Sequence, residues 1–177
     1  MRINSFKKYL KSLEEEDLRE ELLRLYSKLE EVRLFYKMDL GTDKDRQKIF
    51  AKAKKEIAKK YITKSYRRPR RPRIQKVNKL LSETRKATVL DYEMIDVYLF
   101  TCETAFNFML EYNFYSDVLS NNICKTFEKA CDLIEANLMQ AEFKDRCDAI
   151  MALTRKNREI GFRIVDHYDR CFGEDGN

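Results

Sequence analysis

The sequence predicts an all-α protein, and three observations carry that prediction. Only four glycines and two prolines occur in 177 residues, so few positions favour turns. Leu, Glu, Lys, Arg and Ala fill the long stretches between them, and apolar residues recur there every three or four positions. About eight helices are expected. An N-terminal helical lobe over 1–61 and a basic, proline-containing hinge over 62–73 would precede a C-terminal antiparallel helical bundle or short helical-hairpin stack over 74–177.

The first 41 residues predict a short helix and a longer one. Ser5 is expected to cap the short helix, and Gly41 to end the long helix, which begins at the acidic stretch 14–17. Apolar residues of the long helix follow steps of four, three, four, three and four, at Leu18, Leu22, Leu25, Leu29, Val32 and Tyr36. This spacing matches a heptad seam. Because the seam covers fewer than three heptads, packing within the chain is favoured over a dimerising coiled coil.

The third predicted helix follows Thr42, which can act as its N-cap, and it is amphipathic. One face is apolar, with Phe50, Ala53, Ile57 and Tyr61. The opposite face carries Lys44, Lys48, Lys52, Lys55 and Lys59. At 100° per residue these lysines form one continuous row. A solvated outer surface is the simpler interpretation of such a row, and an anion-binding surface is the alternative.

Residues 67–73, here called the arginine segment, hold five arginines and both prolines of the chain. Each proline keeps the preceding residue, Arg68 or Arg71, out of the α region and removes a backbone donor. The segment is therefore expected to be extended and exposed, where planar guanidinium groups suit phosphate or carboxylate. The next helix should begin near Arg73 and continue the positive surface, with Lys76, Lys79, Arg85 and Lys86.

From Asp91 the sequence becomes aromatic and acidic, and it predicts four more helices. The first should be the most buried, because its apolar residues cover more than one stripe. The others are expected from Ser116, from about Glu142 and from about Arg158. An aromatic cluster accompanies the end of the first helix, at Phe106, Phe108, Tyr112, Phe114 and Tyr115. Its helical spacing favours core packing over a stacking platform.

Charge divides the chain unevenly. Residues 44–86 contain 18 Lys and Arg against 3 Asp and Glu, a net charge of +15. Residues 87–177 contain 9 against 17, a net charge of −8. The basic part can therefore meet an acidic partner or fold against the acidic part of its own chain. The sequence leaves both possibilities open.

No pattern in the sequence predicts catalysis, a metal site or a cofactor. A glycine-rich phosphate loop, a nucleophile elbow and paired metal-binding histidines are all missing from it. The five cysteines are never spaced as Cys-x-x-Cys, and with the single His167 they favour free thiols in the core over zinc. No stretch approaches the roughly 18 apolar residues of a membrane span. We expect a non-enzymatic cytoplasmic protein without a membrane span.

Several short motifs resemble a family of small bacterial proteins that is known only as a domain of unknown function. They are Lys8-Tyr9-Leu10-Lys11-Ser12-Leu13, Leu25-Tyr26 with Glu31-Val32 and Phe35-Tyr36, the run 54–61, the arginine segment, and Glu142-Phe143-Lys144-Asp145-Arg146. One departure is Glu14, at a helix start where a serine cap is expected. The resemblance covers most of the chain. It implies kinship, and no activity or functional residue comes with it.

The leading hypothesis is a protein that grips nucleic-acid phosphates without reading the base sequence. Its candidate residues are Lys52, Lys55, Lys59, Lys60, Arg67, Arg68, Arg70, Arg71, Arg73, Lys76 and Lys79. The alternative is a helical protein–protein interaction module or scaffold, in which the basic segment pairs with the protein's own acidic surface or a partner's. A homodimer is one form that this alternative can take.

Overall fold

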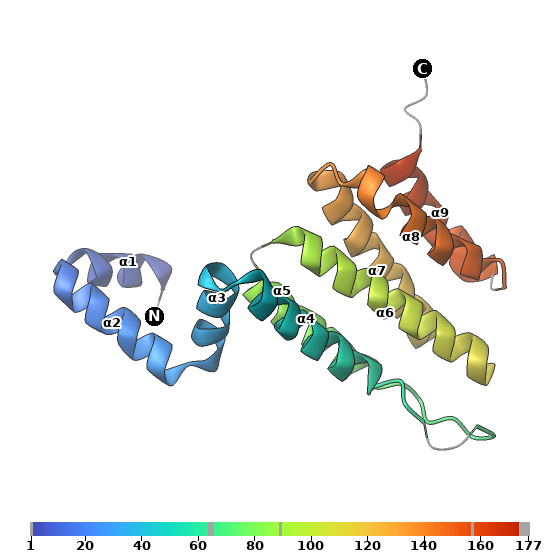
Figure 1. Ribbon diagram of the computed structural model, residues 1–177, viewed down its shortest axis with the longest axis horizontal. Coiled ribbons are helices and arrows are strands. Elements are labelled where there is room, and N and C mark those ends of the chain that lie inside the picture. The colour runs from blue at the N-terminus through green and yellow to red at the C-terminus, as the bar shows by residue number, and fades with distance from the viewer. Residues whose placement is uncertain (1, 64–65, 89, 157, 174–177) are drawn as a thin grey trace.

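The computed structural model describes residues 2–63, 66–88, 90–156 and 158–173, and within these residues all regular structure is helical. The prediction of an all-α fold is confirmed (Figure 1). The helices are α1 (Ile3–Lys11), α2 (Glu15–Lys28), α3 (Glu30–Leu40), α4 (Asp43–Ala58), α5 (Ile74–Ala87), α6 (Asp91–Tyr112), α7 (Asp117–Ala136), α8 (Gln140–Thr154) and α9 (Arg158–Phe172).

Helix α6 lies at the centre of the molecule. Eleven of its 22 residues are buried, more than in any other described helix, and it packs against α4, α5, α7 and α8. Leu99 and Phe106 are fully enclosed. Burying a side chain of this kind contributes about 1.5–3 kcal/mol. Its apolar residues surround the whole helix, as the sequence predicts, because it has neighbours on several sides.

The C-terminal half consists of two helical hairpins. Helix α6 ends at Asn113, which adopts a left-handed conformation (φ 47°), and Ser116 caps α7 by accepting a hydrogen bond from the backbone N–H of Leu119 at 3.3 Å. Helices α6 and α7 therefore form an antiparallel pair. Helices α8 and α9 form the second pair, and α9 packs along α7. The predicted helix starts at Ser116 and Arg158 are confirmed to within one residue, and α8 starts two residues before the predicted Glu142.

The N-terminal region differs from the prediction in two ways. The single helix expected up to Gly41 is interrupted at Leu29, whose backbone is extended (φ −110°, ψ 120°), so α2 and α3 are separate helices. Acidic residues at the start of α3 favour a new helix N-terminus there. Helix α1 begins at Ile3 with Arg2 at the cap position, and the predicted cap Ser5 lies inside the helix.

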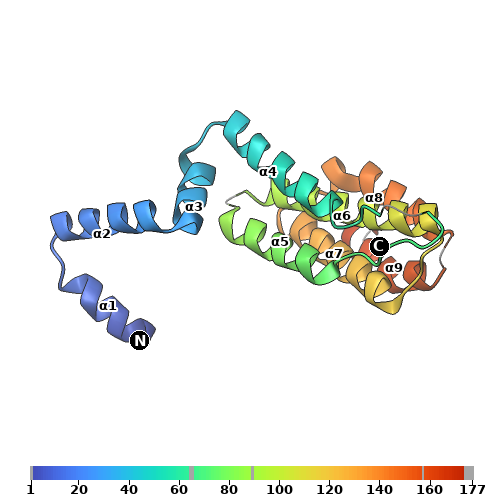
Figure 2. The same cartoon turned by 90° about the horizontal axis from the view of Figure 1, so that it is seen from below.

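Helices α1 and α2, here called the arm, stand apart from the rest of the molecule (Figure 1). Figure 2 shows the same separation from below, with α3 between the arm and α4. Neither helix of the arm contains a buried residue, whereas α3 inserts Met38 into the common core. Helices α4 and α5, on either side of the expected hinge, pack on each other and on α6. The lobe and hinge boundaries remain sequence-based predictions.

Candidate nucleic-acid interface

The connection between α4 and α5 carries the arginine segment. It runs out beyond the end of α4 and returns to the start of α5 (Figure 1). Two hydrogen bonds join the first and last parts of this connection. The Arg73 N–H donates to the Lys60 carbonyl at 3.3 Å, and the Arg70 N–H donates to Thr63 Oγ1 at 2.9 Å. The described residues 66–73 form no helix, as the two prolines predict.

Two tyrosines fix this connection to the end of α6. The Tyr61 ring is buried and lies 6.0 Å from the Phe108 ring, measured between centroids. The Tyr66 ring lies 5.6 Å from the Tyr112 ring but is 71% exposed. The base of the connection is therefore part of the core, while the arginine segment projects from it.

The arginine side chains point into solvent. All five arginines of the segment are exposed. Within the described residues, no carboxylate lies within ion-pair distance of Arg67, Arg70, Arg71 or Arg73. The same is true of Lys52 and Lys55 on α4 and of Lys76 on α5. These cations are thus left unneutralised by the part of the fold that the structure describes.

The remaining candidate lysines have acidic neighbours. Lys59 and Lys60 share Glu56, with Nζ–Oε distances of 2.5 Å and 3.6 Å. The hydrogen bond from Lys59 lowers the pKa of the Glu56 carboxyl, although burial opposes the effect. Lys79 lies 3.6 Å from Glu83. Lys60 is the only candidate residue that is not exposed, so it is the least accessible member of the set.

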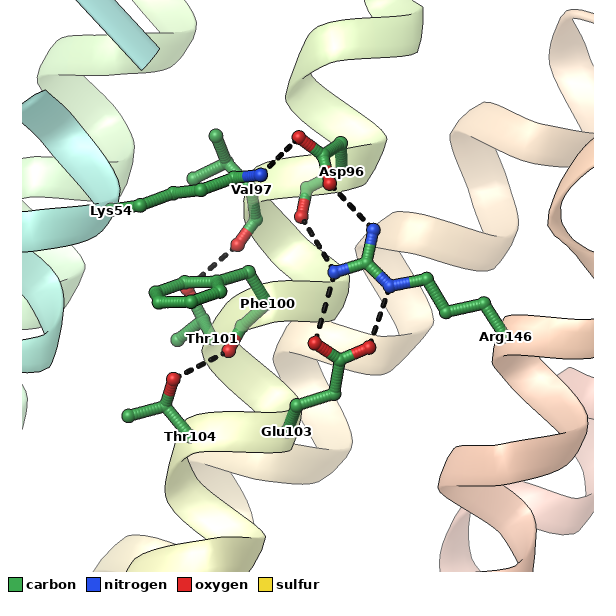
Figure 3. A network of polar contacts seen from close by, with 8 residues as sticks. All are labelled: Lys54, Asp96, Val97, Phe100, Thr101, Glu103, Thr104 and Arg146. Atoms are coloured by element: carbon green, nitrogen blue, oxygen red, sulfur yellow. Dashed lines mark hydrogen bonds and ion pairs between the residues drawn. The ribbon is translucent and has the colours of Figure 1, made fainter. Parts of the chain in front are cut away.

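A different set of cations neutralises the acidic half of the chain. Lys54 on α4 and Arg146 on α8 both bind Asp96 on α6 (Figure 3). Arg146 also forms a bidentate contact with Glu103, with N–O distances of 2.6 Å and 3.0 Å. This network joins three helices. Because Lys54 and Arg146 point inward, they are structural residues and do not belong to the exposed basic surface.

Two further arginines have the same structural role. Arg85 binds Asp91, and Arg170 binds both Asp132 and Glu135. All of these pairs use basic residues outside the arginine segment. Carboxylates of the acidic half therefore pair with cations from both parts of the chain, with Lys54 and Arg85 from residues 44–86 and Arg146 and Arg170 from residues 87–177. The arginine segment stays outside these pairs.

A hollow of about 530 Å³ lies beside the arginine segment. One wall consists of residues 71–76, and the other is the turn between α6 and α7, with Phe114, Tyr115 and Val118. The Tyr115 ring is 49% exposed. Phe106 and Phe108 are buried, as the core interpretation of the aromatic cluster predicts, but Tyr115 faces the hollow.

Tyr66 is not among the residues that the sequence predicts as functional, and Tyr115 belongs to the aromatic cluster for which core packing was favoured over a stacking platform. Tyr66 directly precedes the arginine segment, and this adjacency was the available signal. No sequence pattern brings Tyr115 close to residues 71–76, because they are about 40 positions apart in the chain. Together the exposed rings and the guanidinium groups can hold bases by stacking and phosphates by charge.

We find no arrangement typical of a catalytic site among the described residues. No group of three or more His, Cys, Asp or Glu side chains among these residues could hold a metal ion. All five cysteines are free and buried, and burial raises the pKa of the Cys147 thiol to about 12. A thiol with this pKa stays protonated at neutral pH and is a poor nucleophile. None of the described helices combines the length and apolar composition needed to cross a membrane.

Comparison with known proteins places the chain in a family. No curated protein and no solved structure matches it. A family model described as "Family of unknown function (DUF6155)" matches residues 1–169, which is nearly the whole chain. Two of the motifs that carried the resemblance, 54–61 and 142–146, contribute Lys54 and Arg146 to the network around Asp96. The protein therefore belongs to this family of unknown function, DUF6155.

Proposed function

We propose that this protein binds nucleic acid through the phosphates, using the arginine segment and the lysines of α4 and α5, without reading the base sequence. The observation that carries the proposal is the exposure of Arg67, Arg70, Arg71 and Arg73 with no carboxylate of the described chain beside them. Exposed cations without an acidic neighbour can bind the phosphates of a nucleic acid. Binding is driven by the release of the counterions that these phosphates had held.

The expected strength follows from the same mechanism. Binding that rests on phosphate contacts alone has a Kd of about 10⁻⁴–10⁻⁶ M at physiological salt. If about five phosphates of a single strand are neutralised, affinity falls about a hundredfold between 50 and 200 mM salt. A bacterial cytoplasm, where RNA and DNA are abundant, is the location that suits this function.

The hollow beside the arginine segment favours single strands over duplexes. Tyr115 lines the hollow with Arg71 and Arg73, and the exposed Tyr66 directly precedes the arginine segment. Stacking of an unpaired base on an exposed tyrosine contributes about 1–3 kcal/mol. A duplex keeps its bases inside the helix and can use the arginines only. We therefore expect single-stranded RNA or DNA to bind more tightly than the matching duplex.

A protein–protein interaction module is the second candidate. The observation in its favour is the uncovered apolar surface of the arm, which the arginine segment does not explain. Pairing of the arginine segment with the protein's own acidic half receives less support, because Asp96, Glu103, Asp132 and Glu135 bind other cations. An acidic partner protein remains an alternative ligand for the segment.

Fluorescence anisotropy tests the proposal with labelled single-stranded RNA, single-stranded DNA and duplex DNA at about 50 and 200 mM salt. The test variant replaces Arg67, Arg68, Arg70, Arg71 and Arg73 by serine. The control variant removes the same charge elsewhere by replacing Lys7, Lys8, Lys11, Arg155 and Arg158, which are exposed and form no ion pair within the described residues. Both variants have the same net charge.

Micromolar binding that weakens at higher salt, disappears in the test variant and persists in the control variant supports the proposal. Equal losses in the two variants would mean that net charge, and not this surface, is responsible. Absence of binding by the unmodified protein at low salt would overturn the proposal. Replacing Tyr66 and Tyr115 by alanine should then reduce single-strand affinity by about thirtyfold or more and leave duplex affinity unchanged.

A further inference from the structure

The arm exposes an apolar surface that nothing in the described chain covers. On α1, Ile3 and Tyr9 are 71% and 43% exposed, and on α2, Leu22, Leu23 and Tyr26 are 49%, 68% and 45% exposed. Neither helix has a buried residue. Exposed large apolar side chains that gather in one region of a protein are typical of an interaction site. Such a surface needs a partner, and the rest of the molecule indicates which one.

A groove of about 800 Å³ between α5 and α7 offers the matching surface. Its floor is apolar and includes Ile74, Leu81 and Leu133. Its rim carries Lys86, Lys125 and Lys129, which are exposed and form no ion pair within the described residues. The groove is therefore apolar inside and positive at its edges.

A buried polar atom in the groove is also left without a partner. Asn122 is 6% exposed and lines the groove, and its Nδ2 donates a hydrogen bond to Asn78 Oδ1 at 2.7 Å. Its own Oδ1 accepts no hydrogen bond from any described residue. An unsatisfied buried acceptor costs about 1–3 kcal/mol. The atom is enclosed beneath the groove surface, so it marks a polar part of the otherwise apolar floor.

Helix α2 has the charge, the polarity and the length that this groove requires. Helix α2 itself contains five Asp and Glu against three Lys and Arg, a net charge of −2, and the flanking Glu14, Glu30 and Glu31 bring residues 14–31 to −5. Helix α2 and helix α5, which forms one side of the groove, both have 14 residues, or about 21 Å at 1.5 Å per residue.

Direct pairing of two arms is a poorer solution. The apolar seam stops at Leu29, where α2 ends, so α2 offers less than two heptads to a coiled coil. Two α2 helices side by side would also bring together two segments that each carry a net charge of −2. Opposite charges meet only when α2 lies against the α5–α7 groove.

We propose that α2 of one copy of this protein docks in the α5–α7 groove of a second copy, and that the second copy returns the same contact. The exchange gives a closed, two-fold symmetric dimer in which an amphipathic helix fills a groove twice. It covers the apolar face of both arms and places acidic residues of α2 beside Lys125 and Lys129. The inference rests on the arm and the groove, and it is independent of nucleic-acid binding.

The test is the mass of the full-length protein in solution, measured by light scattering and by sedimentation at roughly 1–100 μM, a range that spans typical dimer affinities. The unmodified chain of 21.3 kDa should have twice this mass at the higher concentrations. The groove variant is Lys125→Glu with Lys129→Glu. The arm variant is Glu15→Lys with Glu21→Lys, two residues that flank the apolar stripe of α2.

Each of these two variants should raise the dimer Kd about tenfold or more, because two like charges then face each other across the contact. The combined four-substitution variant should recover most of the affinity, since the charges are opposite again. The control variant Lys52→Glu with Lys55→Glu changes two exposed lysines on α4 and should dimerise like the unmodified protein. Leu22→Ser should weaken the dimer but leave the melting temperature unchanged at concentrations low enough for the protein to be monomeric, since Leu22 lies outside the core.

Three results would overturn the inference. The first is a monomer at every concentration, which would mean that the arm folds back on its own chain or meets another protein. The second is a dimer that neither charge reversal weakens, which would place the contact elsewhere. The third is a combined variant as weak as the single ones, which would show that the arm and the groove do not meet.

Discussion

At the scale of single residues, basic side chains of this protein divide into two groups by what lies beside them. Arg146 lies between Asp96 and Glu103, and Lys54 binds the same Asp96 from another helix (Figure 3). Arg67 and Arg71 meet no carboxylate within the described residues. The first group stabilises the fold, whereas the second is available for a ligand.

We expect Arg146→Ala to destabilise the protein by about 1–3 kcal/mol, because it removes the arginine's hydrogen bonds from half-buried Glu103 and leaves half-buried Asp96 with Lys54 in place of two cations. Urea unfolding followed by circular dichroism measures the change. Arg155→Ala, which removes an exposed arginine near the end of α8, is the matched control and should change the free energy of unfolding by less than about 0.5 kcal/mol. Equal stability of the two variants would contradict the structural role of Arg146.

At the scale of elements, the ends of the helices are set by single backbone conformations. Asn113 ends α6 in the left-handed region, which asparagine tolerates well. Leu138, just after α7, also has a positive φ of 55° and its side chain is 84% exposed. A leucine in this conformation is strained, and its exposed side chain gains little from packing in return.

Replacing Leu138 by glycine should therefore stabilise the protein, by about 0.5–1 kcal/mol, since glycine adopts positive φ without steric cost. Thermal and chemical unfolding both measure this gain. Leu138→Ala keeps the Cβ atom, and with it the strain, so it should show no increase in stability. If both variants gave the same increase, loss of the exposed side chain and not the backbone would be the cause.

The interruption at Leu29 is the second important feature at this scale. If α2 continued into α3 without a break, the seam from Leu18 to Tyr36 would form one straight face. The extended backbone at Leu29 separates the two parts, so that Met38 on α3 reaches the core while α2 turns away from it. A single residue thus decides that the N-terminal region is an arm and not a helix of the bundle.

At the scale of the whole molecule, the positive and negative regions are both exposed and are held apart. The arginine segment projects from one end of the α4–α5 pair, and the acidic α2 belongs to the arm at the other side of the molecule (Figure 1). This polarity suits two separate contacts, one with nucleic acid and one with a second copy. We therefore expect mutations in the arginine segment to change nucleic-acid binding and mutations in α2 to change association with a second copy.

The variant in which all five arginines of the segment become serine should unfold with nearly the same free energy as the unmodified protein, within about 0.5 kcal/mol. The reason is that these side chains lie on the surface and the backbone hydrogen bonds at Arg70 and Arg73 do not depend on side-chain identity. Differential scanning calorimetry checks this expectation. A loss above about 2 kcal/mol would indicate that the segment pairs with its own chain, and it would favour the interaction-module alternative.

Much of the fold is determined by the sequence alone. The scarcity of glycine and proline, the spacing of apolar residues and the caps at Thr42 and Ser116 predict an all-α chain and most of the observed helices, because periodicity and capping act within a few residues. The irregular, exposed arginine segment is predictable for the same reason, since proline acts on its direct neighbour.

Only the tertiary structure decided which charges are neutralised and which surfaces stay uncovered. Asp96 meets Lys54 and Arg146 across 42 and 50 positions of sequence, and Tyr115 lines the same hollow as Arg71 across a similar separation. The break at Leu29 likewise exposed an apolar face that heptad spacing had suggested was packed. Local sequence sets the backbone of each helix, but the burial and pairing of its side chains depend on neighbours that only the assembled fold supplies.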